Sequence, residues 1–216
     1  MELYLAMALT FVVALVISNS VVLIHEEDGS VSTFFSKQMT DIRWFVTTAL
    51  ILTATGFFLI DQPLIYFAIG MLLAITTIFD LKYLLAPDFM NGFIAIAGLF
   101  YTLITYKHLS SLSEALICCM ILFLAWLAMH YLFDGGIGGG DFKLLMALSF
   151  VLGINNLFIA VTVGIFSAMS MVLVTLIRRQ KLNEVTVPLV PFLLVGYIVA
   201  VKYGDKLIEL YGGGGF

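Results

Sequence analysis

The chain has 216 residues, of which 62% are hydrophobic and 11% charged, with a mean hydropathy of +1.12. These values exceed what a water-soluble core requires, so a lipid bilayer is the expected solvent. The formal net charge is -4 and the basic residues are scattered. This pattern excludes the basic stripe of a nucleic-acid-binding protein.

Charged and turn-forming residues divide the sequence into eight continuous apolar segments. A membrane-spanning helix needs roughly 20 mostly apolar residues, and continuous apolarity favours helices over an alternating barrel pattern. The sequence therefore predicts an all-α, polytopic transmembrane helix bundle of about eight spans, forming a single membrane-embedded domain over 1–216. The segments cover residues 2–24, 44–60, 64–79, 89–106, 115–133, 143–153, 157–177 and 187–204.

Three features of these segments allow further structural predictions. The first segment has no basic stretch before it and is long enough to span, so we expect a retained helix rather than a cleaved signal peptide. Asp61, Gln62 and Pro63 alone separate the second segment from the third, which predicts a tight helical hairpin. Cys118 and Cys119 are adjacent, which is poor geometry for a disulfide, so we expect packing residues.

The loop charges predict the orientation in the membrane. With eight spans, the loops 25–43, 80–88, 134–143 and 178–186 share one side. These loops hold seven Lys and Arg residues, against three for the other loops and the C-terminal tail. The positive-inside rule therefore assigns the first set to the cytoplasm, and Asp80 and Asp141 with it.

Asp80 and Asp141 stand at junctions between long apolar runs and loops. Ionisable groups at membrane depth are functional candidates, although each acid could also mark a helix end among the headgroups. Five glycines lie within 135–140, directly before Asp141. This density permits close backbone approach and could accommodate an extended segment, or it could form a flexible loop. A phosphate-binding loop is disfavoured because no Gly-Lys-Ser/Thr ending follows.

Two carboxylates that lie close together could act as a general acid and a general base. Like-charge repulsion leaves one proton on such a pair, so one member can activate water while the other protonates a carbonyl oxygen. Neither a metal nor a cofactor is required. The three histidines, His25, His108 and His130, have no metal-ligand spacing, and we expect His130 to be a helix-packing residue.

Three motifs resemble the prepilin peptidase family, the membrane aspartic peptidases of the GxGD type. The stretch from Asp80 to Pro87-Asp88 resembles the family's aspartate followed by a Pro-Asp pair. Gly138-Gly139-Gly140-Asp141-Phe142-Lys143-Leu144 matches its Gly-x-Gly-Asp-x-Lys-Leu pattern. Val187-Pro188-Leu189-Val190-Pro191-Phe192-Leu193 is similar to its Pro-Phe-Gly-Pro-Phe-Leu motif, with Leu189 and Val190 in place of Phe and Gly.

The resemblance implies a function and a set of site residues. It assigns catalysis to Asp80 and Asp141, and it assigns substrate binding or cleft shaping to Gly138, Gly140, Pro188 and Pro191. The implied substrates are type IV prepilins, pseudopilins or preflagellins, cut at the cytoplasmic face of a prokaryotic cell membrane without a cofactor. Asp88 is expected to cap a helix, and Lys82 and Lys143 to be non-catalytic cations at the membrane edge.

The sequence also departs from the bacterial family pattern. Many bacterial members carry a cysteine-rich domain after the first span and methylate the new N-terminus, whereas the loop from His25 to Arg43 contains no cysteine. Methyltransferase activity is therefore not expected. A presenilin or signal-peptide-peptidase relative remains an alternative, although Phe79 stands where those enzymes have a tyrosine. A proton-coupled transporter is another, although the inverted repeats of such proteins are not evident.

Overall fold

A computed structural model describes residues 42–83, 85–106, 109–132, 139–177 and 188–212. All regular structure within these ranges is helical, which confirms the predicted all-α class for this part of the chain. The helices are α3 (Ile42–Leu59), α4 (Leu64–Tyr83), α5 (Asp88–Tyr106), α6 (Leu109–Leu132), α7 (Gly139–Ile177) and α8 (Val190–Gly212).

Three stretches of these helices are long and apolar enough to cross a membrane. They are Leu64–Tyr83, Leu112–Leu132 and Gly139–Met169, and Val46–Leu59 and Asp88–Ile104 are shorter apolar helices. A helix makes all of its backbone hydrogen bonds within itself, so long apolar helices of this kind fit a bundle embedded in lipid. The total of about eight spans stays a prediction, because the first predicted segment, 2–24, lies outside the described residues.

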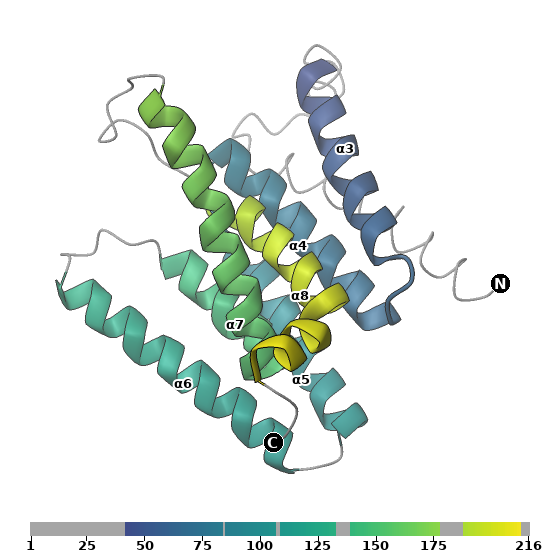
Figure 1. The fold of residues 1–216 in the computed structure, drawn as a ribbon, viewed down its shortest axis with the longest axis vertical. Coiled ribbons are helices and arrows are strands. Elements are labelled where there is room, and N and C mark those ends of the chain that lie inside the picture. Colours follow the sequence, from purple (N-terminus) through teal and green to yellow (C-terminus); the bar gives the residue numbers. More distant parts are fainter. Residues whose placement is uncertain (1–41, 84, 107–108, 133–138, 178–187, 213–216) are drawn as a thin grey trace.

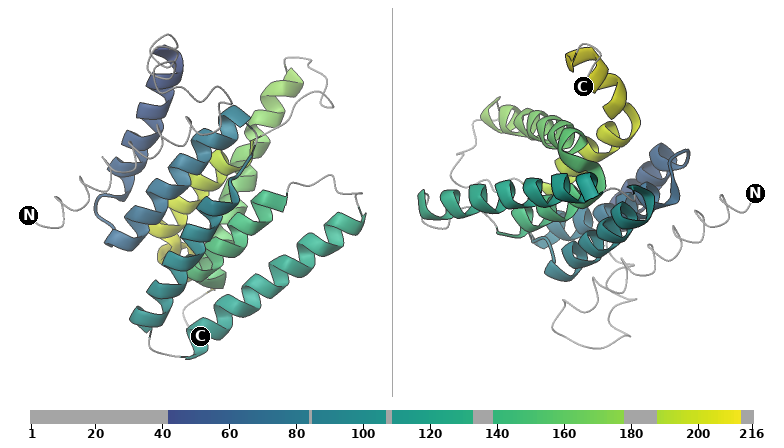
Figure 2. Two further views of the ribbon diagram at one scale, coloured as in Figure 1. Left: turned by 180° about the vertical axis from the view of Figure 1, so that it is seen from behind. Right: turned by 90° about the horizontal axis from the view of Figure 1, so that it is seen from below.

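Helices α4, α7 and α8 form the centre of the bundle. In Figure 1, α8 lies between α4 and α7, and α3 lies on the outer side of α4. Helix α6 runs along the edge in both Figure 1 and Figure 2 and packs mainly on α7. Only 11% of the α6 span is buried, against 67% of the α4 span. Helix α6 is therefore an outer wall of the bundle.

The predicted hairpin between the second and third segments is present. The Gln62 N–H donates to the Leu59 carbonyl at 3.0 Å, and the Phe67 N–H donates to the Pro63 carbonyl at 3.1 Å. The turn therefore ends α3 and starts α4 within a few residues. This places α3 beside α4.

Helix α7 is broken at Gly153. This glycine has φ 65° and ψ 178°, a conformation open essentially to glycine alone. The break coincides with the predicted end of the sixth apolar segment at residue 153. A break in a helix frees backbone carbonyls, and the Thr102 hydroxyl from α5 donates to the Phe150 carbonyl at 2.6 Å. The two halves of α7 therefore correspond to the sixth and seventh predicted segments.

The second half of α7 crosses α8 at close range through small residues. A Cβ on Gly196 of α8 would overlap the Ala160 carbonyl of α7, and Gly164 lies against the backbone of Phe192 and Leu193. Small residues at such crossings let helix backbones approach closely. This contact fixes the start of α8 against α7, which matters for the site described next.

Candidate active site

Asp80 lies in the last turn of α4 and is nearly inaccessible, with 4% of its surface exposed. The helix continues to Tyr83, beyond the end predicted at residue 79. The Val190 N–H donates to Asp80 Oδ2 at 2.9 Å, and the Leu189 backbone amide also faces this carboxylate. Because Val190 begins α8, Asp80 sits at the positive end of the α8 dipole. The carboxylate thus ties α4 to α8.

The start of α8 explains why these amides are available. The Phe192 and Leu193 N–H groups both donate to the Leu189 carbonyl, at 3.1 and 3.0 Å, so the helix begins directly after Leu189. Pro188 precedes this point, and Pro191 lies in the first turn, where a missing N–H costs nothing. Both prolines therefore flank the start of α8 that contacts Asp80, while their expected cleft-shaping role stays a prediction.

Asp141 lies in the first turn of α7, which begins at Gly139 rather than at the predicted residue 143. The two glycines before Asp141 allow close packing. A Cβ on Gly140 would lie 3.2 Å from the Ala86 carbonyl oxygen, and one on Gly139 would lie 3.6 Å from Trp126 Nε1. Gly140 thus lets the turn approach the segment before α5, whereas the contact of Gly139 with α6 is of ordinary van der Waals length. Gly138 lies outside the described residues.

Two polar contacts hold the start of α5 against the start of α7. The buried Asn91 side chain donates from Nδ2 to the Gly140 carbonyl at 3.3 Å, and Lys143 Nζ pairs with Asp88 Oδ2 at 2.8 Å. Asp88 is the first residue of α5, and its expected role as a cap of this helix stays a prediction. Asn91 was not a candidate from the sequence, where its only distinguishing feature is a polar amide inside the apolar segment 89–106.

The two carboxylates, 61 positions apart in the sequence, lie in the same region of the structure. Asp141 lies close enough to Asp80 for their charges to interact. Leu189, whose amide faces Asp80, also lines a cavity of about 340 Å³ that has Asp141 in its wall. We call this space the Asp141 cavity. Asp80, Asp141 and the start of α8 therefore lie near one another.

Among the described residues, the histidine and the two cysteines noted in the sequence give no sign of a catalytic role. His130 stacks on Trp126 within α6, with ring centroids 5.6 Å apart, while His25 and His108 lie outside the described residues. Cys118 and Cys119 are both free thiols. The described residues contain no cluster of three or more His, Cys, Asp or Glu side chains suited to a metal ion.

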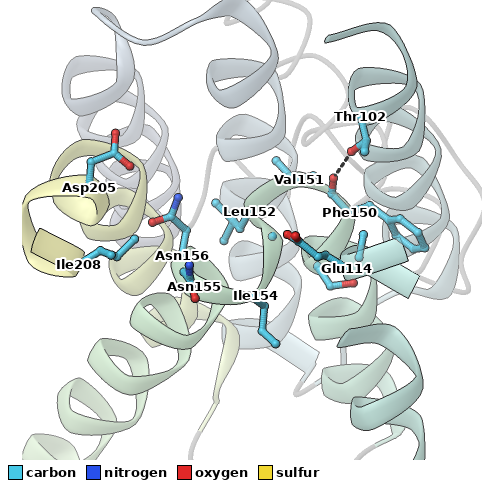
Figure 3. A pocket seen from close by; sticks show the side chains of 13 residues that line it. Thr102, Glu114, Phe150, Val151, Leu152, Ile154, Asn155, Asn156, Asp205 and Ile208 are labelled. Carbon is cyan, nitrogen blue, oxygen red and sulfur yellow. Dashed lines mark hydrogen bonds between the residues drawn. The ribbon is translucent and has the colours of Figure 1, made fainter. Parts of the chain in front are cut away.

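A second cavity lies at the break in α7, away from the two aspartates. It has a volume of about 250 Å³, and Gly153 is one of the residues that line it. Figure 3 shows its neighbours Leu152 and Ile154 in the wall. Gly153 is 12 residues beyond Asp141, which corresponds to roughly 18 Å along a helix. Glu114 from α6, Asp205 from α8 and Asn156 from α7 line it. This cavity contributes no residue to the Asp80–Asp141 site.

Comparisons with known proteins agree with the motifs around the two aspartates. The model of the type IV leader peptidase family matches residues 66–177. The chain is 34% identical over 149 residues to a prepilin leader peptidase/N-methyltransferase of Bacillus subtilis (strain 168), covering 65% of this chain and 56% of that protein. It is 29% identical over 174 residues to the protein of the same name from Legionella pneumophila, covering 78% of this chain and 60% of that protein.

The chain thus spans less than two thirds of the length of either curated relative. No solved structure matches it significantly. The matched residues 66–177 include Asp80, Asp141 and the glycines before Asp141. On the family match, which covers more than half of the sequence, the chain belongs to the type IV leader peptidase family.

Proposed function

We propose that this protein is a membrane aspartic endopeptidase that removes the leader peptide from type IV prepilin-like substrates. This class includes prepilins, pseudopilins and preflagellins. The observation that carries the proposal is the proximity of Asp80 on α4 to Asp141 on α7, in a chain of the type IV leader peptidase family. Two neighbouring carboxylates retain one proton between them, which suits water activation without a metal or a cofactor.

The surroundings of the two acids favour different roles for them. The Val190 N–H and the start of α8 stabilise negative charge on Asp80, so Asp80 is the ionised member that takes a proton from the attacking water. Asp141 carries the shared proton and donates it to the carbonyl oxygen of the scissile peptide. When the tetrahedral intermediate collapses, the C–N bond breaks and the proton from water passes to the leaving nitrogen.

Other residues of the site position this pair. Gly140 lets the Asp141 turn lie against Ala86, and Pro188 and Pro191 set the start of α8 at Asp80. The proposed active site faces the cytoplasm of a prokaryote, with the helices in its cell membrane. The excess of basic residues in the loops on this side supports that orientation.

Cleavage of a prepilin-like substrate by protein reconstituted in liposomes tests the proposal. We expect Asp80→Asn and Asp141→Asn each to lower kcat by about 10²- to 10⁴-fold, the range for loss of a general acid or base. Asp61→Asn is the matched control, because Asp61 is an exposed acid in the α3–α4 turn. Near-normal cleavage by either active-site variant would exclude the two-aspartate mechanism. Proton-driven solute uptake without cleavage would favour a transporter.

We also propose that cleavage occurs without methylation of the new N-terminus. The two curated relatives carry both activities in their names, but the loop from His25 to Arg43 has no cysteine to build a metal-bound subdomain. Cleavage in the presence of S-adenosylmethionine, followed by mass spectrometry of the product, measures whether the new N-terminus is methylated. We expect an unmodified N-terminus, and addition of one methyl group would contradict this part of the proposal.

A further inference from the structure

Two hollows in the bundle adjoin at the break in α7. The first is the cavity of about 250 Å³ at Gly153, which we call the break cavity. The second is a groove of about 720 Å³ between the second half of α7 and the end of α8, which we call the α7–α8 groove. Ile154, Asn155 and Ile208 line both spaces, so the groove continues from the cavity.

The α7–α8 groove has the lining and the length of a site for one acyl chain. Its walls are mostly apolar, and the rings of Phe158 and Phe166 are 72% and 69% exposed. The lining on α7 runs from Ile154 to Phe166, which corresponds to about 18 Å of helix. Half of a bilayer hydrocarbon core is about 15 Å thick, whereas a spanning helix of a partner protein would need a contact of about 30 Å. The groove therefore fits a lipid of one leaflet.

The break cavity concentrates negative charge at one end of this groove. The first half of α7 ends at Gly153, so the carbonyl end of its dipole lies at the cavity. Glu114 of α6 and Asp205 of α8 are exposed acids in its wall (Figure 3). Lys206 is also exposed but does not line the cavity. The charge of the wall therefore favours a cation.

Asn156 adds a reason to expect a cation that carries N–H donors. Its side chain lines the break cavity, and its buried Oδ1 accepts no hydrogen bond within the described part of the chain. Buried polar atoms in proteins are normally hydrogen-bonded, so an open acceptor calls for a donor. An ammonium group offers three N–H donors, and carboxylates bind such donors strongly.

The break cavity also lies at a suitable level of the bundle for a lipid headgroup. Thr102, near the end of α5, and Glu114, near the start of α6, both line it. Asp80 and Asp141 lie instead near the end of α4 and at the start of α7, at the other end of the bundle. A headgroup in the cavity and an acyl chain in the groove would match the order of polar and apolar layers in one leaflet.

We propose that the break cavity and the α7–α8 groove together bind one phospholipid with a primary ammonium headgroup, of the phosphatidylethanolamine class, in the leaflet opposite the two aspartates. The ammonium lies among Glu114, Asp205 and Asn156, and one acyl chain lies along Phe158 and Phe166. A headgroup with net negative charge is repelled by the acids, and a quaternary ammonium has no N–H to donate. The proposal does not depend on the peptidase function.

Native mass spectrometry of the full chain tests the headgroup site. The protein is mixed with equal amounts of phosphatidylethanolamine, phosphatidylcholine and phosphatidylglycerol that carry identical acyl chains. We expect retention of phosphatidylethanolamine over phosphatidylglycerol by about tenfold, because each exposed ion pair contributes up to about fivefold in affinity. Glu114→Gln combined with Asp205→Asn should lower this ratio to about two or less, because both ion pairs are lost.

A double variant of exposed acids outside both spaces is the matched control. Asp61→Asn combined with Glu209→Gln removes the same charge, and we expect it to keep the wild-type ratio. Equal retention of the three lipids by wild type would overturn the proposal. An unchanged ratio in the folded Glu114 and Asp205 double variant would overturn it as well.

Substitutions in the groove test the acyl-chain site separately. Val163→Trp fills the groove and should lower retention of all three lipids, whereas Met169→Trp adds the same ring at an exposed position of α7 outside the groove and should not. If Val163→Trp does not fold, Phe158→Ala removes an exposed ring from the wall and should also lower retention. Unchanged retention in the folded groove variant, or a wild-type dimer that Val163→Trp dissociates, would contradict the proposal.

Discussion

At the scale of single residues, the two aspartates are held by different means. Asp80 is buried and accepts a backbone N–H from the start of α8, whereas Asp141 is partly buried at the start of α7 and borders an apolar cavity. A carboxylate at a helix N-terminus is stabilised by unpaired N–H groups and by the helix dipole. The proposed chemistry therefore depends on where α7 and α8 begin, and residues that fix those points should affect turnover.

Asn91 is one such residue, and we expect Asn91→Leu to lower kcat with little change in KM. Leucine is of similar size but cannot donate to the Gly140 carbonyl, so the turn carrying Asp141 loses a contact to α5. A net hydrogen bond is worth about 0.5–1.5 kcal/mol, which corresponds to roughly two- to tenfold in rate if it acts on positioning alone.

Steady-state kinetics of Asn91→Leu and Asn91→Gln check this role. Glutamine keeps an amide donor, so partial recovery of kcat relative to leucine indicates positioning through the hydrogen bond. A fall in thermal stability with an unchanged kcat would instead make Asn91 a purely structural residue.

The sequence identifies some residues of the site better than others. Asp80 and Asp141 are candidates because charged groups beside long apolar runs are costly and therefore rare, and because the family motifs contain them; their catalytic role stays a prediction. The contact of the Val190 amide could not be predicted, because any backbone N–H can donate and only the tertiary fold brings this one to Asp80. The role of Asn91 could not be predicted either, because the sequence does not show which group its amide contacts.

At the scale of helices, the errors in the predicted boundaries follow from the site itself. The apolar pattern ends at the acids, so the sequence stops one segment at residue 79 and starts another at 143. The helices instead run through Asp80 to Tyr83 and begin at Gly139. The contacts with the start of α8 and with α5 stabilise these polar residues inside helices, and such long-range partners leave no mark on the local pattern.

The break in α7 depends on the backbone conformation of Gly153. We expect Gly153→Ala to lower the free energy of unfolding by about 1–3 kcal/mol, the cost of holding a side-chain-bearing residue at such a backbone conformation. A Cβ at Gly153 would have no atom within 4 Å, so crowding cannot cause the loss. Thermal or denaturant unfolding in detergent measures the effect.

Gly92 provides a matched control for this substitution. It lies within α5, and a Cβ there also has no atom within 4 Å, but its φ is not in the left-handed region. Alanine is better than glycine in a helix by roughly 0.5–1 kcal/mol, so Gly92→Ala should be neutral or stabilising. If both substitutions change the free energy of unfolding equally, the backbone conformation at Gly153 does not disfavour a residue with a side chain.

At the scale of the whole molecule, α4 has the length of one membrane span. Its 20 residues correspond to about 30 Å, close to the thickness of a bilayer hydrocarbon core. Asp61 lies just before this helix and Leu85 just after it, near Asp80 and the paired Lys143 and Asp88. The two positions should therefore lie on opposite sides of the membrane, which makes the proposed cytoplasmic orientation measurable.

Single cysteines at these positions test the orientation in cells. In a background with Cys118→Ala and Cys119→Ala, which removes both free thiols, we expect a membrane-impermeant maleimide to label Asp61→Cys in intact cells. Leu85→Cys, exposed after α4, should be labelled only in inverted membrane vesicles. The reverse pattern would place Asp80 and Asp141 on the outer side, where the basic loops contradict the positive-inside rule, and would rule out cytoplasmic cleavage even if both aspartates prove catalytic.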